Sequence, residues 1–223
     1  MRFTVTLLFS FIFAPGFPQY KYGLQPVTFT QYNERVKSDA NLKLIDLEKF
    51  IPKIVLDIRY ATTNNFTGEK IYDQAKAYAI TPVANALKQA QVEFRKHGYG
   101  IKIFDAYRPY AATVKFYEVY PDTNFVASPY RGSRHNRGCA IDMTLVDLQT
   151  GKELKMPTGY DAFVREARPD SPVQDEEVKR NRALLIDVMS KQGFRVNSAE
   201  WWHFDFAGYQ KYPVLDIAFE ELD

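Results

Sequence analysis

The sequence predicts a single α+β domain, with an antiparallel sheet and flanking helices. Segments with helical and with strand periodicity are mixed along the chain, without the regular alternation of a doubly wound fold. The length of 223 residues, with 46% hydrophobic and 25% charged residues, fits one ordinary globular domain. Disorder is excluded as a general description, because 17 Phe and 15 Tyr are far more aromatic residues than a solvated coil carries.

Charge and cysteine content exclude several classes of function. The formal net charge of +2, from 29 basic and 27 acidic residues, gives no reason to expect nucleic acid or an anionic membrane as partner. The single Cys excludes both an internal disulfide and a four-cysteine zinc site. Any metal must therefore be held by His, Asp or Glu, and the chain has only three His.

Residues 1–16 have the pattern of a secretory signal peptide. Arg2 precedes an apolar run over residues 3–14, which is shorter than the ~20 residues that a membrane span needs. Small residues near Gly16 offer a cleavage site. The alternative is a hydrophobic strand or helix packed on the core. We expect cleavage to leave residues 17–223 as one exported domain, periplasmic or secreted, without stable membrane insertion. If residues 1–16 are not a signal peptide, the protein would stay cytoplasmic.

The N-terminal quarter of the chain shows weak patterns. Residues 17–40 read as an extended leader, because they lack a strong periodicity. Residues 43–50 and 53–60 are expected to pair, and the second segment alternates apolar and polar side chains as a strand does. Residues 62–68 have the composition of a loop.

The following segments show clearer helix and strand signals. Thr81 is expected to cap a helix whose first residue is Pro82, and His97 is expected at its exposed end. The remaining elements are, in chain order, a strand over 101–106, a helix from Pro109 to about Tyr120, a strand over 140–146, a helix over 176–191 and a strand over 201–207.

Two short motifs carry the candidate chemistry. S-R-H-N-R-G-C-A-I-D, residues 133–142, places His135 in a polar stretch and Asp142 in the following strand. E-W-W-H, residues 200–203, places His203 three residues after Glu200. A carboxylate in an otherwise apolar strand is costly unless it is paired or binds a metal.

Two His and one Asp would make a zinc site with one open coordination position. Zinc in such a site lowers the pKa of a water to ~7. Glu200 and His203 would face opposite sides of a continuous strand, so we expect a bend that lets Glu200 act as general base. The alternative is that both His are hydrogen-bonded core residues.

The two motifs resemble those of a known family. The first motif resembles the S-x-H-x-x-G-x-A-x-D signature of zinc D-alanyl-D-alanine peptidases, and the second resembles their E-x-W-H signature. D-I-R-Y-A-T-T-N-N-F-T-G (57–68), D-A-Y-R-P (105–109) and G-Y-D-A-F (159–163) are similar, in the same order, to stretches of VanX-type D-alanyl-D-alanine dipeptidases. The resemblance covers about residues 45–207.

The resemblance implies a fold, a cofactor and residue roles. The fold would be the small α+β fold of these zinc peptidases, also described as hedgehog-like. One Zn²⁺ per chain would be held by His135, Asp142 and His203. Glu200 would be the catalytic acid and base, and Arg108 would stabilise the tetrahedral transition state.

Four positions are less defined. Arg108, read without the resemblance, could instead cap a helix or pair with Asp105. Ser133 and Arg134 are candidates for substrate contact. Cys139 replaces the small residue expected at its position, and it should point away from the metal if Asp142 points toward it.

The activity implied is zinc-dependent hydrolysis of the dipeptide D-alanyl-D-alanine to two D-alanines, in cell-wall peptide metabolism. One alternative is a D,D- or L,D-carboxypeptidase or an endopeptidase of the same zinc family, acting on peptidoglycan stem peptides. Another is a non-catalytic zinc-binding domain. A dipeptidase must close around a free amine and a free carboxylate, and residues 146–172 are long enough to form a lid.

Overall fold

The computed structural model describes residues 20–222, so the segment 1–16 that we assign as a signal peptide lies outside the described residues. A five-stranded sheet has the order β2-β4-β5-β7-β6, and β1 and β3 form a separate two-stranded sheet. The strands are β1 (Leu44–Asp46), β2 (Val55–Leu56), β3 (Tyr78–Ile80), β4 (Tyr99–Asp105), β5 (Ala140–Asp147), β6 (Phe194–Val196) and β7 (His203–Phe206).

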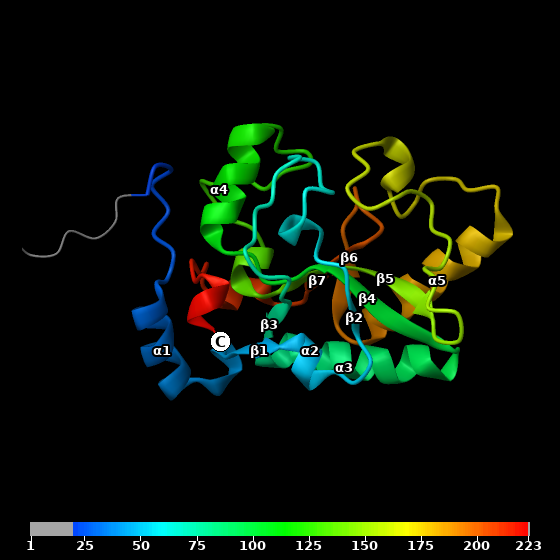
Figure 1. The fold of residues 1–223 in the computed structure, drawn as a ribbon, viewed down its shortest axis with the longest axis horizontal. Helices are drawn as coiled ribbons and strands as arrows, with labels where there is room; N and C mark the ends of the chain where they lie inside the picture. Colours follow the sequence, from blue (N-terminus) through cyan, green and yellow to red (C-terminus); the bar gives the residue numbers. More distant parts are fainter. Residues whose placement is uncertain (1–19, 223) are drawn as a thin grey trace, which may run out of the picture.

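The longer helices lie on opposite sides of the sheet. Figure 1 shows α3 and α5 along one side, and α4 together with the long loops on the other. The α-helices are α1 (Phe29–Ser38), α2 (Leu47–Phe50), α3 (Thr81–Lys96), α4 (Tyr110–Val119) and α5 (Glu176–Lys191). None of the helices within residues 20–222 is long and apolar enough to cross a membrane.

The predicted α+β class is confirmed, with one refinement. The pairs β4–β5, β5–β7 and β6–β7 are antiparallel, whereas the edge strand β2 runs parallel to β4. The register of β4 against β5 shifts between Ile103 and Asp105. A bulge of this kind bends a strand and redirects its side chains. Here it lies where β4 leads into the D-A-Y-R-P motif.

The predicted pairing of residues 43–50 with 53–60 is wrong. β1 pairs with β3, and β2 pairs with β4. The chain cannot continue as a strand after Asp46, because this side chain caps α2 by accepting hydrogen bonds from the backbone N–H groups of Glu48 and Lys49. The cap starts a helix in the middle of the first segment, which was expected to pair with the second as a strand.

The extended leader predicted over residues 17–40 is also partly wrong, because it contains α1. The side chain of Gln31 accepts a hydrogen bond from the backbone N–H of Thr28 at the start of this helix. Tyr32 is the only residue of α1 that is buried. A helix that buries so little leaves a weak periodic signal in the sequence.

The helix expected after residue 80 forms, but its cap lies one residue earlier. Ile80 is the N-cap of α3 and Pro82 lies in its first turn. The hydroxyl of Thr81 instead donates a hydrogen bond to the carbonyl of Ala40. His97 is exposed at the C-terminal end of α3, as predicted.

Candidate metal centre

The fold brings His135, Asp142 and His203 together at the end of two paired strands. Asp142 in β5 and His203 in β7 are direct partners in the antiparallel register. His135 starts a short 3-10 helix over His135–Arg137 that leads into β5. Gly138 ends that helix in the left-handed conformation, at φ 62°, and so turns the chain into the strand.

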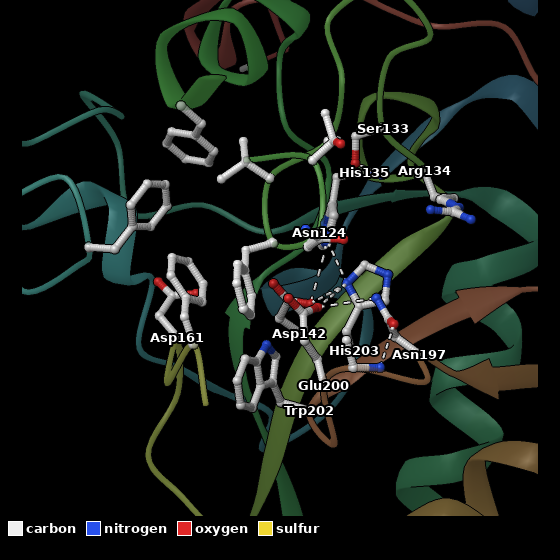
Figure 2. A pocket seen from close by; sticks show the side chains of 18 of the residues that line it. Asn124, Ser133, Arg134, His135, Asp142, Asp161, Asn197, Glu200, Trp202 and His203 are labelled. Atoms are coloured by element: carbon white, nitrogen blue, oxygen red, sulfur yellow. Dashed lines mark hydrogen bonds and ion pairs between the residues drawn. The ribbon is translucent and has the colours of Figure 1, made fainter. Parts of the chain in front are cut away.

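Donor atoms of the three residues converge on one point (Figure 2). Nδ1 of His203 lies 2.9 Å from Oδ1 of Asp142, and Nε2 of His135 lies 3.4 Å from the same oxygen. The two ring nitrogens are 3.2 Å apart. Ligands around a tetrahedral zinc ion with bonds of ~2.0–2.1 Å are about 3.3 Å apart. The buried Oδ1 has no hydrogen-bond donor, so this donor set fits zinc.

The other ring nitrogens are held by hydrogen bonds that fix the imidazole orientations. Nδ1 of His135 lies 2.7 Å from the carbonyl oxygen of Ala106. Nε2 of His203 lies 2.9 Å from Oδ1 of Asp205. When the neutral rings donate to these acceptors, the other nitrogen of each ring faces the shared point without a proton, as metal ligation requires. Asp205 lies two residues after His203 on the same strand face, which allows this contact.

Electrostatics also mark the cluster as a cation site. Burial alone would raise the pKa of Asp142, but His135 and His203 hold it well below its usual range. The carboxylate is therefore the ionised ligand that a metal needs.

Glu200 lies in the loop before β7, where the predicted bend occurs. The strand begins at His203 rather than at Trp201, and Trp201 and Trp202 form a turn. The turn places a carboxylate oxygen of Glu200 3.7 Å from Nδ1 of His203. The amide of Asn197 donates to this oxygen at 3.3 Å. Burial and the charge of Asp142 raise the pKa of Glu200 despite the nearby imidazoles.

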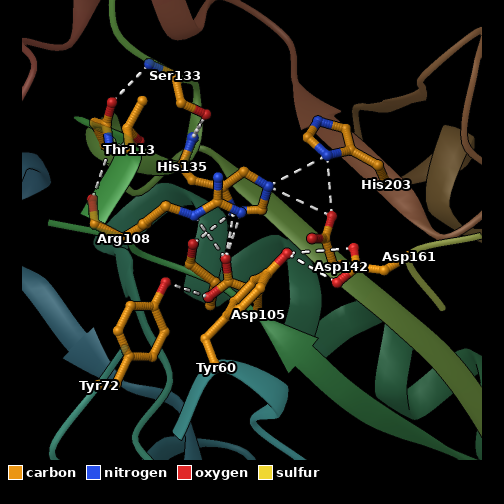
Figure 3. A network of polar contacts seen from close by, with 12 residues as sticks. Tyr60, Tyr72, Asp105, Arg108, Thr113, Ser133, His135, Asp142, Asp161 and His203 are labelled. Carbon is orange, nitrogen blue, oxygen red and sulfur yellow. Dashed lines mark hydrogen bonds and ion pairs between the residues drawn. The ribbon is translucent and has the colours of Figure 1, made fainter. Parts of the chain in front are cut away.

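Arg108 reaches the same cavity from the segment after β4. Its guanidinium donates two hydrogen bonds to Oδ2 of Asp105, at 2.7 and 3.0 Å, and Tyr72 donates to the other oxygen at 3.0 Å (Figure 3). The guanidinium also lies over the rings of Phe116 and Tyr60, at 4.6 and 5.4 Å. Arg108 therefore pairs with Asp105, as the alternative reading held, and in addition lines the cavity.

Ser133 and Arg134 also line the cavity. The hydroxyl of Ser133 accepts a hydrogen bond from the backbone N–H of His135 at 3.2 Å, and its O–H can still donate. Arg134 is half-exposed and lies 3.5 Å from Asp205. Ser133 thus supports the ligand loop, whereas Arg134 presents a charge at the mouth. Cys139 is buried and lies outside the ligand cluster.

The cavity has a volume of ≈660 Å³, and part of its wall was not assigned from the sequence. The hydroxyl of Tyr60 donates to both carboxylate oxygens of Asp161, at 3.0 and 3.2 Å. Burial and the charge of Asp142 raise the pKa of Asp161 well above its usual range. The sequence signal was present, since Tyr60 and Asp161 lie in two of the flanking motifs. The segment 146–172, expected as a lid, contributes Asp161 and several following residues to this wall.

Comparison with known proteins places the chain in a family. The M15 peptidase family model, described as D-ala-D-ala dipeptidase, matches residues 40–219. The D-alanyl-D-alanine dipeptidase of Escherichia coli (strain K12) is 36% identical over 177 residues, which cover 78% of this chain and 89% of the relative. That of Enterococcus faecalis is 29% identical, covering 71% of this chain and 88% of the relative.

A solved structure of the LdcB LD-carboxypeptidase is similar to 75% of this chain and 69% of its own, with a TM-score of 0.41 and 20% sequence identity. The family match over residues 40–219 includes all the residues gathered around the cavity. The chain belongs to the M15 family of zinc peptidases, and His135, Asp142 and His203 form the donor set that fits its zinc ion.

Proposed function

We propose that the protein hydrolyses D-alanyl-D-alanine to two D-alanines, with Zn²⁺ as cofactor. The observation that carries the proposal is the arrangement of Glu200 and Arg108 in the cavity that also contains the three-ligand cluster. A purely structural zinc site would need neither residue. The names of the relatives, which are D-alanyl-D-alanine dipeptidases, support the substrate.

Each chemical step has a residue in position. When bound, Zn²⁺ supplies Lewis-acid chemistry toward a water and the scissile carbonyl. Glu200 takes a proton from the attacking water, and the raised pKa brings this carboxyl closer to neutral pH, where proton transfer is most effective. Glu200 then passes the proton to the leaving amine. Arg108 donates hydrogen bonds to the oxygen that becomes negative in the transition state.

Asp161 offers a site for the free ammonium of a dipeptide. Its carboxyl lines the cavity and accepts hydrogen bonds from Tyr60, and the charge of Arg108 acts on it. A bound ammonium would stabilise the ionised carboxylate, which burial otherwise disfavours. We assign the opposite end of the substrate, its carboxylate, to Arg134 and the loop of Ser133.

An amine-release assay on the zinc-loaded protein tests the proposal. It compares D-Ala-D-Ala, L-Ala-L-Ala and an N-acylated tripeptide ending in D-Ala-D-Ala. We expect cleavage of the free D,D-dipeptide, and at least ~100-fold lower kcat/KM for the acylated tripeptide, because blocking the amine leaves Asp161 without its partner.

The same assay separates the other functions. Comparable kcat/KM on the dipeptide and the acylated tripeptide would identify a carboxypeptidase, for which the cavity of ≈660 Å³ leaves space. Absence of hydrolysis of all three peptides by a zinc-bound, folded chain would contradict the dipeptidase and D,D-carboxypeptidase functions and leave an L,D-carboxypeptidase, an endopeptidase or a non-catalytic zinc domain.

We also propose that the protein is exported, with residues 1–16 as its signal peptide. Its support is the apolar run over residues 3–14 after Arg2. N-terminal sequencing of the protein from its producing cell should begin near Phe17. An intact Met1 in a cytoplasmic fraction would contradict the export.

A further inference from the structure

The mouth of the cavity carries positive charge, whereas its interior carries negative charge. Arg165 and Arg168 line the main cavity and also, together with Asp170, line an adjoining hollow of ≈360 Å³. The interior contains the carboxylates of Asp142, Asp161 and Glu200. A ligand that reaches from the interior to this mouth therefore passes from acidic to basic surroundings.

The two arginines at the mouth are available for a ligand. The side chain of Arg165 is exposed, and its charge acts on the exposed carboxylate of Asp170. The guanidinium of Arg168 pairs with Asp170 at 3.2 Å, where the two side chains are 48% and 73% exposed. Exposed pairs of this kind are weak and are readily exchanged for another carboxylate.

The backbone that carries these arginines is held in place. The hydroxyl of Ser171 donates to the carbonyl of Arg165 at 2.7 Å, and Arg182 donates to the carbonyl of Ser171 at 2.9 Å. The backbone N–H of Trp201 donates to the carbonyl of Ala167 at 2.8 Å. The rim is therefore tied to α5 and to the turn that carries Glu200, and a held rim loses less entropy when it binds.

The cavity is larger than a dipeptide of two alanines. Its ≈660 Å³ has room for roughly twenty waters at ~30 Å³ each, whereas such a dipeptide has about a dozen non-hydrogen atoms. A longer side chain could extend from the ligand cluster to the mouth.

We propose that Arg165 and Arg168 form an anion-binding rim that recognises a carboxylate additional to the C-terminal one of the substrate. The preferred substrates would then be D,D-dipeptides with an acidic second residue, such as D-Ala-D-Glu. The proposal rests on the proposed function in one respect, that a peptide occupies the main cavity. A guanidinium fork matches a carboxylate in two hydrogen bonds. Asp161 in the interior favours a ligand that also carries an ammonium, which inorganic anions lack.

Calorimetric binding to the zinc-loaded Glu200→Gln protein tests the rim without depending on turnover. The probes are D-Ala-D-Glu and D-Ala-D-Gln, which have almost the same shape and differ in one charge. We expect D-Ala-D-Glu to bind about tenfold more tightly, since each exposed ion pair contributes a factor of up to about five. The preference should fall below about twofold when R165Q and R168Q are added.

A matched control removes the same charge elsewhere. Arg95 in α3 and Arg180 in α5 are exposed and do not line the cavity, so R95Q/R180Q should keep the preference. Equal affinities for the two dipeptides, binding of neither, or a preference that survives R165Q/R168Q would overturn the rim. Hydrolysis of D-Ala-D-Ala by the wild-type chain is measured separately. A chain that prefers D-Ala-D-Glu but does not hydrolyse D-Ala-D-Ala would refute the proposed function and retain the rim.

Discussion

The pair of strands β5 and β7 and the loop wall around Asp161 contribute to one cavity, but they are held in different ways. Asp142 and His203 are positioned by the backbone ladder, in which each residue has a fixed partner. The loop wall is positioned by side chains. The amide of Asn65, for example, donates to the carbonyls of Thr62 and Glu69, at 2.7 and 2.9 Å, and so shapes the loop that carries Phe66.

This difference between backbone and side-chain positioning explains what the strand pair and the loop wall can each determine. A one-residue slip in the strand pair would move every side chain to the other face, so the ligand positions are strongly determined. A loop wall can change its residues without changing the sheet. We therefore expect the strand pair to determine whether metal and chemistry are present, and the loops to determine which substrate enters.

The largest effect should follow from removing a ligand on the strand pair. His203→Ala should lose bound zinc and all measurable turnover, because only two of the three protein donors remain and hold the ion poorly. Metal content after dialysis measures this directly. His97→Ala is the matched control, because His97 is exposed at the end of α3, and this variant should keep its zinc. Full zinc occupancy in His203→Ala would contradict the ligand assignment.

The next effect separates chemistry from metal binding at the same strand end. Glu200→Gln should keep zinc and lose about 10²–10⁴-fold in kcat, because it removes the proton acceptor but no ligand. Glu177→Gln is the matched control, because Glu177 is exposed, and this variant should keep its zinc and its kcat. Wild-type kcat in Glu200→Gln would remove Glu200 from the mechanism.

The ligand positions could be predicted from the sequence because their chemistry restricts the residue type. A buried carboxylate at Asp142 is intelligible only with a partner, and two of the three His lie near an acid in the motifs. The parallel pairing of β2 with β4 could not be predicted in this way. Two residues of strand carry too little pattern to choose a partner, and the pairing depends on contacts far apart in the chain.

The wall residues were missed for a related reason. Asp161 acquires its role only when the loop places it beside Tyr60, which is 101 residues earlier in the chain. The hydrogen bond between His203 and Asp205 was not predicted, although the two residues lie on one strand face, because nothing in the sequence shows that Nε2 of His203 needs an acceptor. Contacts between side chains of distant loops follow from the tertiary structure and leave no periodicity.

Asp161→Asn tests the loop wall with little change of shape. We expect kcat/KM for D-Ala-D-Ala to fall by about ten- to hundredfold, because the hydrogen-bonded charge pair with the ammonium is lost. Zinc content should be unchanged. The ratio of kcat/KM between the free dipeptide and the N-acylated tripeptide should fall as well. An unchanged ratio would place the ammonium elsewhere.

A smaller effect concerns the turn that feeds His135 into β5. A Cβ added at Gly138 would lie 2.9 Å from Leu44 Cδ2 and 3.1 Å from the backbone nitrogen of Ile80, at a φ of 62°. Gly138→Ala should therefore lower the free energy of unfolding by about 2–3 kcal/mol. Gly151→Ala has a similar φ of 70° with nothing within 4 Å, so it isolates the backbone strain of ~1–2 kcal/mol. Thermal unfolding measures both variants. If Gly138→Ala and Gly151→Ala lower the free energy of unfolding equally, the contacts near Gly138 relax to make room for the Cβ.

The smallest effect is expected far from both regions, at α1. The side chain of Gln31 accepts from the backbone N–H of Thr28 at 3.1 Å, on an exposed helix that buries only Tyr32. Gln31→Ala removes one half of a capping pair, so the free energy of unfolding should fall by only about 0.5 kcal/mol. Neither zinc content nor kcat/KM should change, because α1 contributes no residue to the cavity wall. Denaturant unfolding measures the free energy of unfolding, and the amine-release assay measures kcat/KM. A change in kcat/KM would show that α1 is coupled to the site. The helix would then be a third region that affects catalysis, beside the strand pair and the loop wall.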